Sequence, residues 1–213
     1  MVSNVVNSYN ANATKSPLLR LPPEVRNRIW TFLLGERSIH VHSSMLKGRP
    51  IVLHRVCAAE VSDDETARMI KEHNKGDDAP EWFATFDVRH QHCSFWSYNA
   101  QARGSGLSLR ALAVCRQIHQ EAALLPYQRN TFSFDSLNSV APFLQSLYSA
   151  QAHAIESISL AGSGGRITRT LQGLIRTKLK GLRSLTWFIE LVNHRGVHNG
   201  MVSNFQYNNS RSY

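Results

Sequence analysis

One segment of this chain, residues 18–35, marks both ends of an amphipathic helix and restricts the possible folds more than any other feature. Its sequence is LLRLPPEVRNRIWTFLLG. Pro23 stands in the first turn, where its missing N–H costs no hydrogen bond, and Leu21 can pack on Val25 as a hydrophobic staple. The apolar residues recur at helical spacing and form one stripe, namely Val25, Ile29, Phe32 and Leu33. We expect Gly35 to end the helix in the left-handed conformation.

The composition is that of an ordinary globular protein. The chain has 213 residues, of which 42% are hydrophobic and 18% charged, so it can bury a real core. No apolar run approaches the ~20 residues that cross a bilayer, and we expect no membrane partner. Residues 1–17 are polar and lack the pattern of a secretory signal, so we expect a disordered tail there.

The cysteines indicate a reducing compartment. The chain has three, Cys57, Cys93 and Cys115, and no CxxC pair. Such a sparse set argues against a disulfide framework and against a zinc site built from cysteines alone. We therefore predict a cytoplasmic or nuclear protein.

Charge is distributed unevenly around the net value of +9. Residues 60–87 hold nine of the fifteen acidic residues and only three basic ones, whereas residues 157–189 contain no acidic residue at all. The asymmetry is typical of a face for nucleic acid or an acidic partner. It is equally compatible with two segments that neutralise each other in the fold.

Patterns along the rest of the chain predict both strands and helices. Residues 38–42 and 50–54 flank Lys47-Gly48-Arg49 and predict a β-hairpin. Residues 108–125 predict a second helix that Ser108 caps and Pro126 ends. Its apolar stripe is Ala111, Val114, Cys115, Ile118, Ala122 and Leu125.

After residue 130 the elements alternate. Strands are predicted at 130–134, 155–160 and 185–192, with helices at 140–148 and 167–182 between them. This order is typical of parallel crossover units, and the spacing of about 26 residues falls within the range of leucine-rich repeats. The polar residues 194–213 predict a tail.

Together the two helices and the following Asn-Thr-Phe-x-Phe segment resemble a family of fungal F-box-like proteins. The resemblance covers roughly residues 18–160. The matching residues are Leu21, Pro22, Glu24, Arg26, Ile29, Trp30, Val114, Arg116, Gln117, Glu121, Ala122, Asn130, Thr131, Phe132 and Phe134. In a standard F-box the later helices follow the first within a few residues, whereas about seventy residues intervene here.

The resemblance implies a protein-interaction module without catalytic activity. We predict an α+β fold with an F-box-like helical region and inserted hairpin at 18–129, and a leucine-rich-repeat-like extension at 130–193. The resemblance implies docking to the Skp-type adaptor of a cullin-RING ubiquitin ligase, with the extension capturing an unidentified protein substrate. The candidate docking residues are Leu21, Pro22, Val25, Ile29 and Leu33. Alternatively, the same stripe packs on the helix at 108–125.

A basic helix at 166–183 provides an alternative function. Its cations recur opposite the apolar stripe, at Arg169, Arg176, Lys180 and Arg183. Such a ridge could follow the phosphates of a nucleic acid or bind an acidic protein. It could also be a solvated face, or pair with the acidic residues 60–87.

Three other groups of residues contain chemically reactive types, and we predict no chemistry for them. His90, His92 and Cys93 are zinc-ligand types with no nearby fourth ligand, although the pair His40 and His42 could meet them from another strand. Cys115 and His119 are one helical turn apart but lack further catalytic partners. Residues 161–166 are glycine-rich yet match no nucleotide-binding motif. We therefore expect no enzyme, no metal and no cofactor.

Overall fold

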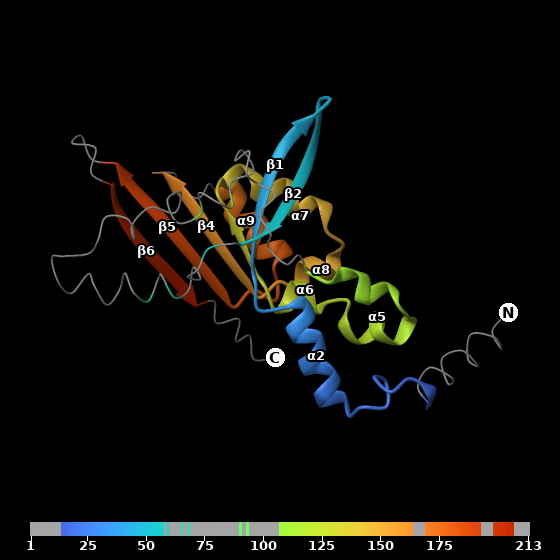
Figure 1. Ribbon diagram of the computed structural model, residues 1–213. Coiled ribbons are helices and arrows are strands. Elements are labelled where there is room, and N and C mark those ends of the chain that lie inside the picture. The colour runs from blue at the N-terminus through green and yellow to red at the C-terminus, as the bar shows by residue number, and fades with distance from the viewer. Residues whose placement is uncertain are drawn as a thin grey trace, which may run out of the picture.

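The computed structural model describes residues 14–57, 59, 65, 68, 90, 93, 107–163, 169–192 and 198–206. Its fold is mixed α/β (Figure 1). The strands are β1 (Ser38–Leu46), β2 (Arg49–Val56), β3 (Thr131–Phe134), β4 (Ser157–Ser163), β5 (Ser184–Val192) and β6 (His198–Gln206). The helices are α2 (Pro23–Leu34), η2 (Leu109–Ala113), α5 (Arg116–Ala122), α6 (Leu125–Gln128), η3 (Leu137–Ser139), α7 (Val140–Ser146), α8 (Ser149–Ala154) and α9 (Arg169–Lys178).

All the described strands join one sheet in the order β2-β1-β3-β4-β5-β6. The inner strands β1, β3, β4 and β5 are parallel, whereas β2 and β6 pair antiparallel at the two edges. The predicted parallel crossover units are therefore confirmed for β3, β4 and β5. The hairpin belongs to the same sheet, because β1 pairs directly with β3.

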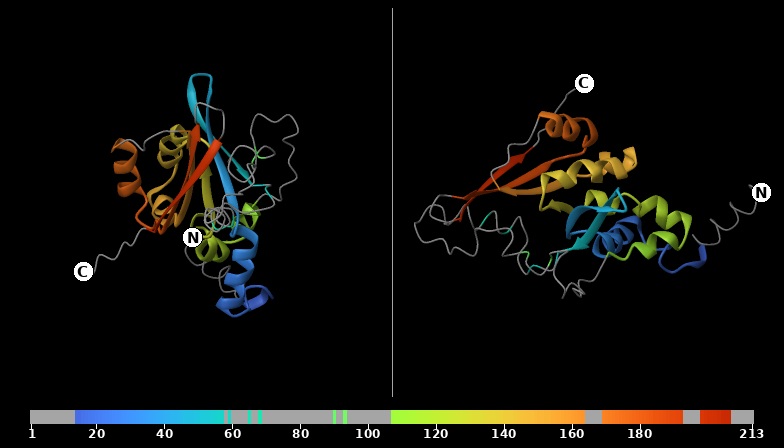
Figure 2. Two further views of the ribbon diagram at one scale, coloured as in Figure 1. Left: turned by 90° about the vertical axis from the view of Figure 1, so that its left-hand side faces the viewer. Right: turned by 90° about the horizontal axis from the view of Figure 1, so that it is seen from above.

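The two faces of the sheet differ in chemistry. Alternate residues such as Phe132, Ile158 and Leu185 form one apolar row across three strands. Helices α7, α8 and α9 cover this face (Figure 2), and apolar residues of α7 and α9 complete the main core. The other face carries small polar side chains, including a buried row made by His40, Ser133, Ser159 and Thr186.

A second core lies where α2 meets α5 and α6, at one end of the sheet (Figure 1). Its buried members are Leu19, Trp30, Leu34, Ile118 and Ala122. Cys115 packs against this cluster as a half-buried residue. The helical region thus has its own hydrophobic interior beside the sheet.

The hairpin prediction is confirmed, including its turn. β1 and β2 pair from Ile39 with Val56 to Leu46 with Arg49. Lys47 and Gly48 both have positive φ, 50° and 75°, which is typical of the two-residue turn that matches the twist of a hairpin.

The helix predicted at 108–125 is wrong as a continuous element. The chain forms η2, becomes extended at Cys115 with φ −158° and ψ 164°, and then starts α5. Ser108 makes no side-chain capping hydrogen bond, and Pro126 lies within α6 rather than ending a helix. Only Ile118 and Ala122 of the predicted stripe are buried, because the break turns Val114 outward.

The predicted end of the first helix also needs correction. Gly35 follows α2 as expected, but its φ of −126° is extended, and Glu36 takes the left-handed conformation instead. Gly35 is required for a different reason. A Cβ there would lie 2.7 Å from the Cβ of Arg129, so the close approach of two segments excludes a larger residue.

Two predictions about the C-terminal part also change. The helix predicted over 166–183 begins, within the described residues, at Arg169 and ends at Lys178, so Lys180 and Arg183 follow it. The polar segment 194–213, predicted as a tail, contains β6. A strand can form there because main-chain hydrogen bonds to β5 do not require an apolar sequence.

Several segments interpreted above lie outside the described residues. These are residues 1–13 of the predicted tail, most of the acidic segment 60–87, residues 164–168 and His92. Among the described residues, no helix combines the length and apolar character that crossing a membrane requires.

Candidate functional site

The inner face of α2 is held to α5 by one carboxylate. Glu121 accepts two hydrogen bonds from Arg26, at 3.0 Å from Nε and 2.7 Å from Nη2. It also accepts bonds from Trp30 Nε1 at 3.3 Å and from Gln117 Nε2 at 3.2 Å. Arg26 donates further to the carbonyl of Leu19 at 3.1 Å. A bidentate guanidinium–carboxylate pair is directional, so this network fixes the orientation of α2 relative to α5.

The network also changes the titration of Glu121. The hydrogen bond from Arg26 is the main reason that the pKa of the carboxyl lies below its usual value. The bonds from Gln117 and Trp30 lower the pKa further, whereas burial acts in the opposite direction. The charged form is therefore the stabilising one.

A buried asparagine joins the helical region to the sheet. Asn130 is 2% exposed and donates to the carbonyls of Leu34 at 2.6 Å and Pro126 at 2.8 Å. Its Oδ1 accepts from the backbone N–H of Arg37 at 2.9 Å. One side chain thus satisfies the end of α2, the start of α6 and the approach to β1.

The predicted docking residues lie on two different parts of the α2 surface. Pro22 and Val25 are exposed, whereas Leu21, Ile29 and Leu33 are half-buried. Ile29 and Leu33 pack against the second core, as the alternative interpretation predicted. Phe32, which was not among the predicted docking residues, is 75% exposed.

These exposures define an outer face on α2. Val25, at 42% exposed, and Phe32 are separated by seven residues and so share one side of the helix. Pro22 and Ile29 fall on the same side, at three residues before Val25 and four after it. We call Pro22, Val25 and Phe32 the outer face of α2, and the half-buried Ile29 at its edge packs against the second core. The outer face is apolar and faces away from the buried Trp30 and Leu34.

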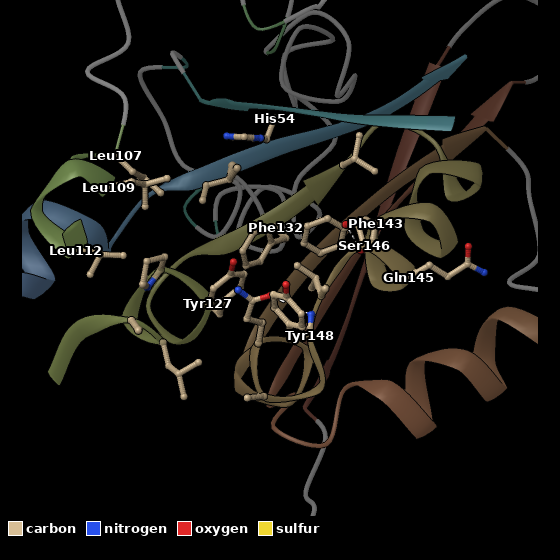
Figure 3. Close-up of a pocket in the computed structure, with 18 of the residues that line it drawn as sticks. His54, Leu107, Leu109, Leu112, Tyr127, Phe132, Phe143, Gln145, Ser146 and Tyr148 are labelled. Atoms are coloured by element: carbon tan, nitrogen blue, oxygen red, sulfur yellow. Dashed lines mark hydrogen bonds between the residues drawn. The ribbon is translucent and has the colours of Figure 1, made fainter. Parts of the chain in front are cut away.

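An apolar cleft of about 870 Å³ lies between the hairpin, η2, α6, α7 and α8 (Figure 3). The aromatic rings of Tyr127, Phe132 and Phe143 lie along it, and Tyr148 stands beside them. Burial raises the pKa of the Tyr127 hydroxyl. His54 and His119 are the ionisable imidazoles of the lining. The cleft is suited to apolar groups rather than to acid–base chemistry.

Histidine and cysteine side chains gather beside the hairpin on the polar face of the sheet. His40, Cys57, His90 and Cys93 place their ligand atoms within 4.8 Å of one another. Cys57 Sγ lies 3.4 Å from His90 Nδ1 and 3.7 Å from Cys93 Sγ. His40, His90 and Cys93 are buried and Cys57 is half-buried. We call these four residues the His–Cys cluster.

The His–Cys cluster differs from the sequence-based hypothesis, in which His90, His92 and Cys93 would meet His40 and His42. His90 and Cys93 lie in a turn closed by a 2.7 Å hydrogen bond from the Cys93 N–H to the His90 carbonyl. Such a turn places residues three apart on the same side, unlike the strand that would have paired His90 with His92. His42 lies elsewhere, 3.2 Å from the carboxylate of Asp135.

Cys57 is the member that sequence reasoning missed. A usable signal was present, because the Lys47-Gly48 turn sets the hairpin register and pairs His40 with Arg55. Extending that ladder places Cys57 opposite Ser38, where its N–H bonds the Ser38 carbonyl at 2.8 Å. Cys57 is thus a diagonal neighbour of His40 on the same face.

The basic residues are accessible. Arg169, Arg176, Lys180 and Arg183 are all exposed. Arg183 lies 3.6 Å from the carboxylate of Glu156, so one of the four is already near an acidic group of the sheet region. The suggested pairing with the acidic segment falls outside the described residues.

The remaining constellations do not form a catalytic arrangement among the described residues. Cys115 packs on the second core while His119 is exposed, and no hydrogen bond between the two side chains is present there. The glycine-rich residues 161–166 are described only as far as Ser163, at the end of β4.

Comparison with known proteins gives one family assignment. Neither the curated proteins nor the solved structures provide a match. A family model described as a domain of unknown function, DUF7730, matches residues 11–164. The match spans α2, the hairpin, α5 and α6, and β3 to β4, and so includes the Glu121 network, Asn130 and the His–Cys cluster. The chain therefore belongs to the DUF7730 family.

Proposed function

We propose that this chain is a protein-interaction module without catalytic activity, which docks a helical partner on the outer face of α2. The observation that carries the proposal is the exposed apolar pair Val25 and Phe32 on a helix whose opposite side is already buried. Large apolar side chains grouped on a well-anchored helix are typical of partner-binding surfaces.

The resemblance to F-box-like proteins suggests the class of partner. An F-box presents an apolar helix surface to the Skp-type adaptor of a cullin-RING ubiquitin ligase, and α2 offers such a surface here. The contacts of α2 with α5 and α6 support this interpretation, because they bring together helices that are far apart in the sequence, with Leu34 ending α2 and Arg116 starting α5. We propose a cytoplasmic or nuclear location, where that ligase class operates.

The substrate side of the proposal concerns the cleft. In an F-box protein the segment that follows the F-box captures the substrate, and α7 and α8 form one wall of the cleft. The leucine-rich-repeat-like interpretation of residues 130–193 rests on their parallel strands and one-sided helices. We propose that the cleft receives an apolar segment of the protein substrate.

The adaptor proposal is tested by measuring the affinity of the purified chain for a purified Skp-type adaptor. Biolayer interferometry gives this affinity directly. The variant Val25→Asp/Phe32→Asp should weaken binding at least tenfold, because each charge opposes desolvation of the contact. Ile29 and Leu33 are unsuitable for this test because they support the second core.

Met45→Asp is the matched control. Met45 is 66% exposed and lies near the tip of the hairpin, far from α2 (Figure 1). It should bind the adaptor as the wild type does. Absence of binding by the wild type, or equal binding by the α2 variant, would rule out adaptor docking through this face.

A second candidate function rests on the exposed cations of the α9 region. We propose, as the alternative, that Arg169, Arg176, Lys180 and Arg183 bind nucleic acid or an acidic protein. Retention of RNA or DNA that falls steeply with salt, and is lost when all four are changed to alanine, would support it. Equal retention by the quadruple variant would refute it.

A further inference from the structure

We propose that His40, Cys57, His90 and Cys93 form a structural zinc site. The inference concerns a separate part of the molecule from the outer face of α2 and does not depend on the proposed function. Two histidines and two cysteines are a common donor set for tetrahedral zinc, which prefers imidazole nitrogen and thiolate sulfur.

Two separations between these ligand atoms match the edges of a zinc tetrahedron. With Zn–S bonds of about 2.3 Å, two sulfurs on one ion are about 3.8 Å apart. The Sγ atoms of Cys57 and Cys93 are 3.7 Å apart. A sulfur and a nitrogen on one ion should be about 3.6 Å apart, and Cys57 Sγ lies 3.4 Å from His90 Nδ1.

The two sulfurs are too far apart for a disulfide, but their separation suits a shared ion. A disulfide requires sulfurs about 2.05 Å apart, far less than the separation here. The rings of His40 and His90 meet edge to face with centroids 4.5 Å apart. Two imidazoles and two sulfurs that converge within 4.8 Å have room for one ion at their centre.

Backbone and neighbouring groups support the proposed ligands. The N–H of Ala59 donates to Cys57 Sγ at 3.3 Å, which favours the thiolate that zinc requires. Arg55 donates to the carbonyl of Cys93 at 3.4 Å and so helps to position that turn. Contacts of this kind around the ligands orient them and tune the metal.

Four protein ligands leave no open position for substrate, so the role is structural rather than catalytic. His40 comes from β1 and Cys57 directly follows β2, whereas His90 and Cys93 come from one turn that is distant in sequence. Zinc would therefore join the turn at 90–93 to the polar face of the sheet. Binding free energy of such a site contributes directly to folding.

The test is to measure the zinc content of the purified full chain by inductively coupled plasma mass spectrometry. Wild type should carry about one zinc ion per chain, and Cys57→Ser/Cys93→Ser should carry none. Cys115→Ser and His42→Gln are the matched controls, because these residues have the same chemistry but lie outside the cluster. Both controls should retain the metal.

A second measurement uses wild type alone, so it does not depend on whether the variant folds. Chelation should lower the melting temperature, and added Zn²⁺ should restore it whereas Mg²⁺ should not. A wild type that neither contains nor takes up zinc would overturn the proposal. So would zinc retained by the double variant, or a Cys57–Cys93 disulfide in protein purified without oxidant.

Discussion

At the scale of single residues, several polar residues that carry the F-box-like resemblance have structural roles. Arg26 and Trp30 from the first helix meet Gln117 and Glu121 from the second in one network. Asn130 connects three backbone segments. The sequence identified these residues as a set but could not pair them, since partners 91 to 96 positions apart depend on the complete fold.

Asn130 should be one of the least replaceable residues of the chain. Asn130→Ala leaves two carbonyls and one N–H without this partner in a buried location, which should lower the free energy of unfolding by about 2–4 kcal/mol. Urea unfolding followed by circular dichroism measures the loss. Asn138→Ala, at an exposed asparagine, is the control, and a loss as small as that of the control would refute the role of Asn130.

Glu121 should make stability depend on pH in the acid range. Its pKa is lowered in the folded state, so the stabilisation is complete above the ordinary glutamate value of about 4.3 and disappears as pH falls through the lowered value. At neutral pH, Glu121→Gln should cost about 1–3 kcal/mol of unfolding free energy. In acid, the difference in unfolding free energy between Glu121→Gln and wild type should become smaller, because the wild-type carboxylate is then protonated.

Urea titrations at neutral and acid pH compare the two proteins, with Glu156→Gln as the control. Glu156 contacts Arg183 at 3.6 Å, and the Arg183 side chain is 77% exposed. Such a surface ion pair contributes little to stability, so its loss should change the unfolding free energy by less than about 0.5 kcal/mol. A Glu121→Gln effect that stays constant with pH would contradict the account of the network.

At the scale of elements, the sequence predicted those that local pattern determines. The hairpin followed from its turn residues, and β3, β4, β5, α7 and α9 followed from apolar periodicity. The prediction of one helix at 108–125 was wrong because its apolar periodicity continued through Cys115, where the chain is extended and packs against the second core. β6 was missed because its pairing with β5 is a main-chain property.

β6 should protect the sheet from association. A chain truncated after Val192 exposes the nine-residue edge of β5, whose hydrogen-bonding groups then lack their partner strand. We expect this truncation to lower the urea midpoint and to form oligomers, as measured by size-exclusion chromatography with light scattering. Truncation after Gln206 keeps β6 and should behave as the full chain. A monomeric short form with an unchanged midpoint would show that β6 is dispensable.

At the scale of the whole molecule, the described residues form two hydrophobic cores that Asn130 joins. The sheet with its helical layer makes one, and α2 with α5 and α6 makes the other. That strands and helices mix in one fold could be predicted from their alternating patterns, and the structure is mixed α/β. The position of the hairpin within the main sheet could not, because the pairing of β1 with β3 is set by packing across more than ninety residues.

The candidate sites also differ in how much of each could be predicted from the sequence. The outer face of α2 was partly predictable from periodicity, although only the fold shows that Phe32 is exposed while Ile29 and Leu33 support a core. The His–Cys cluster was not predictable as a set of four. Its ligands come from β1, the end of β2 and a turn at 90–93, which no spacing rule connects.

Cobalt substitution tests the metal centre most directly. After chelation, the full chain should bind about one Co²⁺ and develop the intense visible bands of a tetrahedral site, with sulfur-to-metal charge transfer in the near ultraviolet. Zn²⁺ should displace the cobalt and remove both features, and Cys57→Ser/Cys93→Ser should show neither. Weak octahedral bands without charge transfer in the wild-type chain would show that the four side chains do not bind metal together.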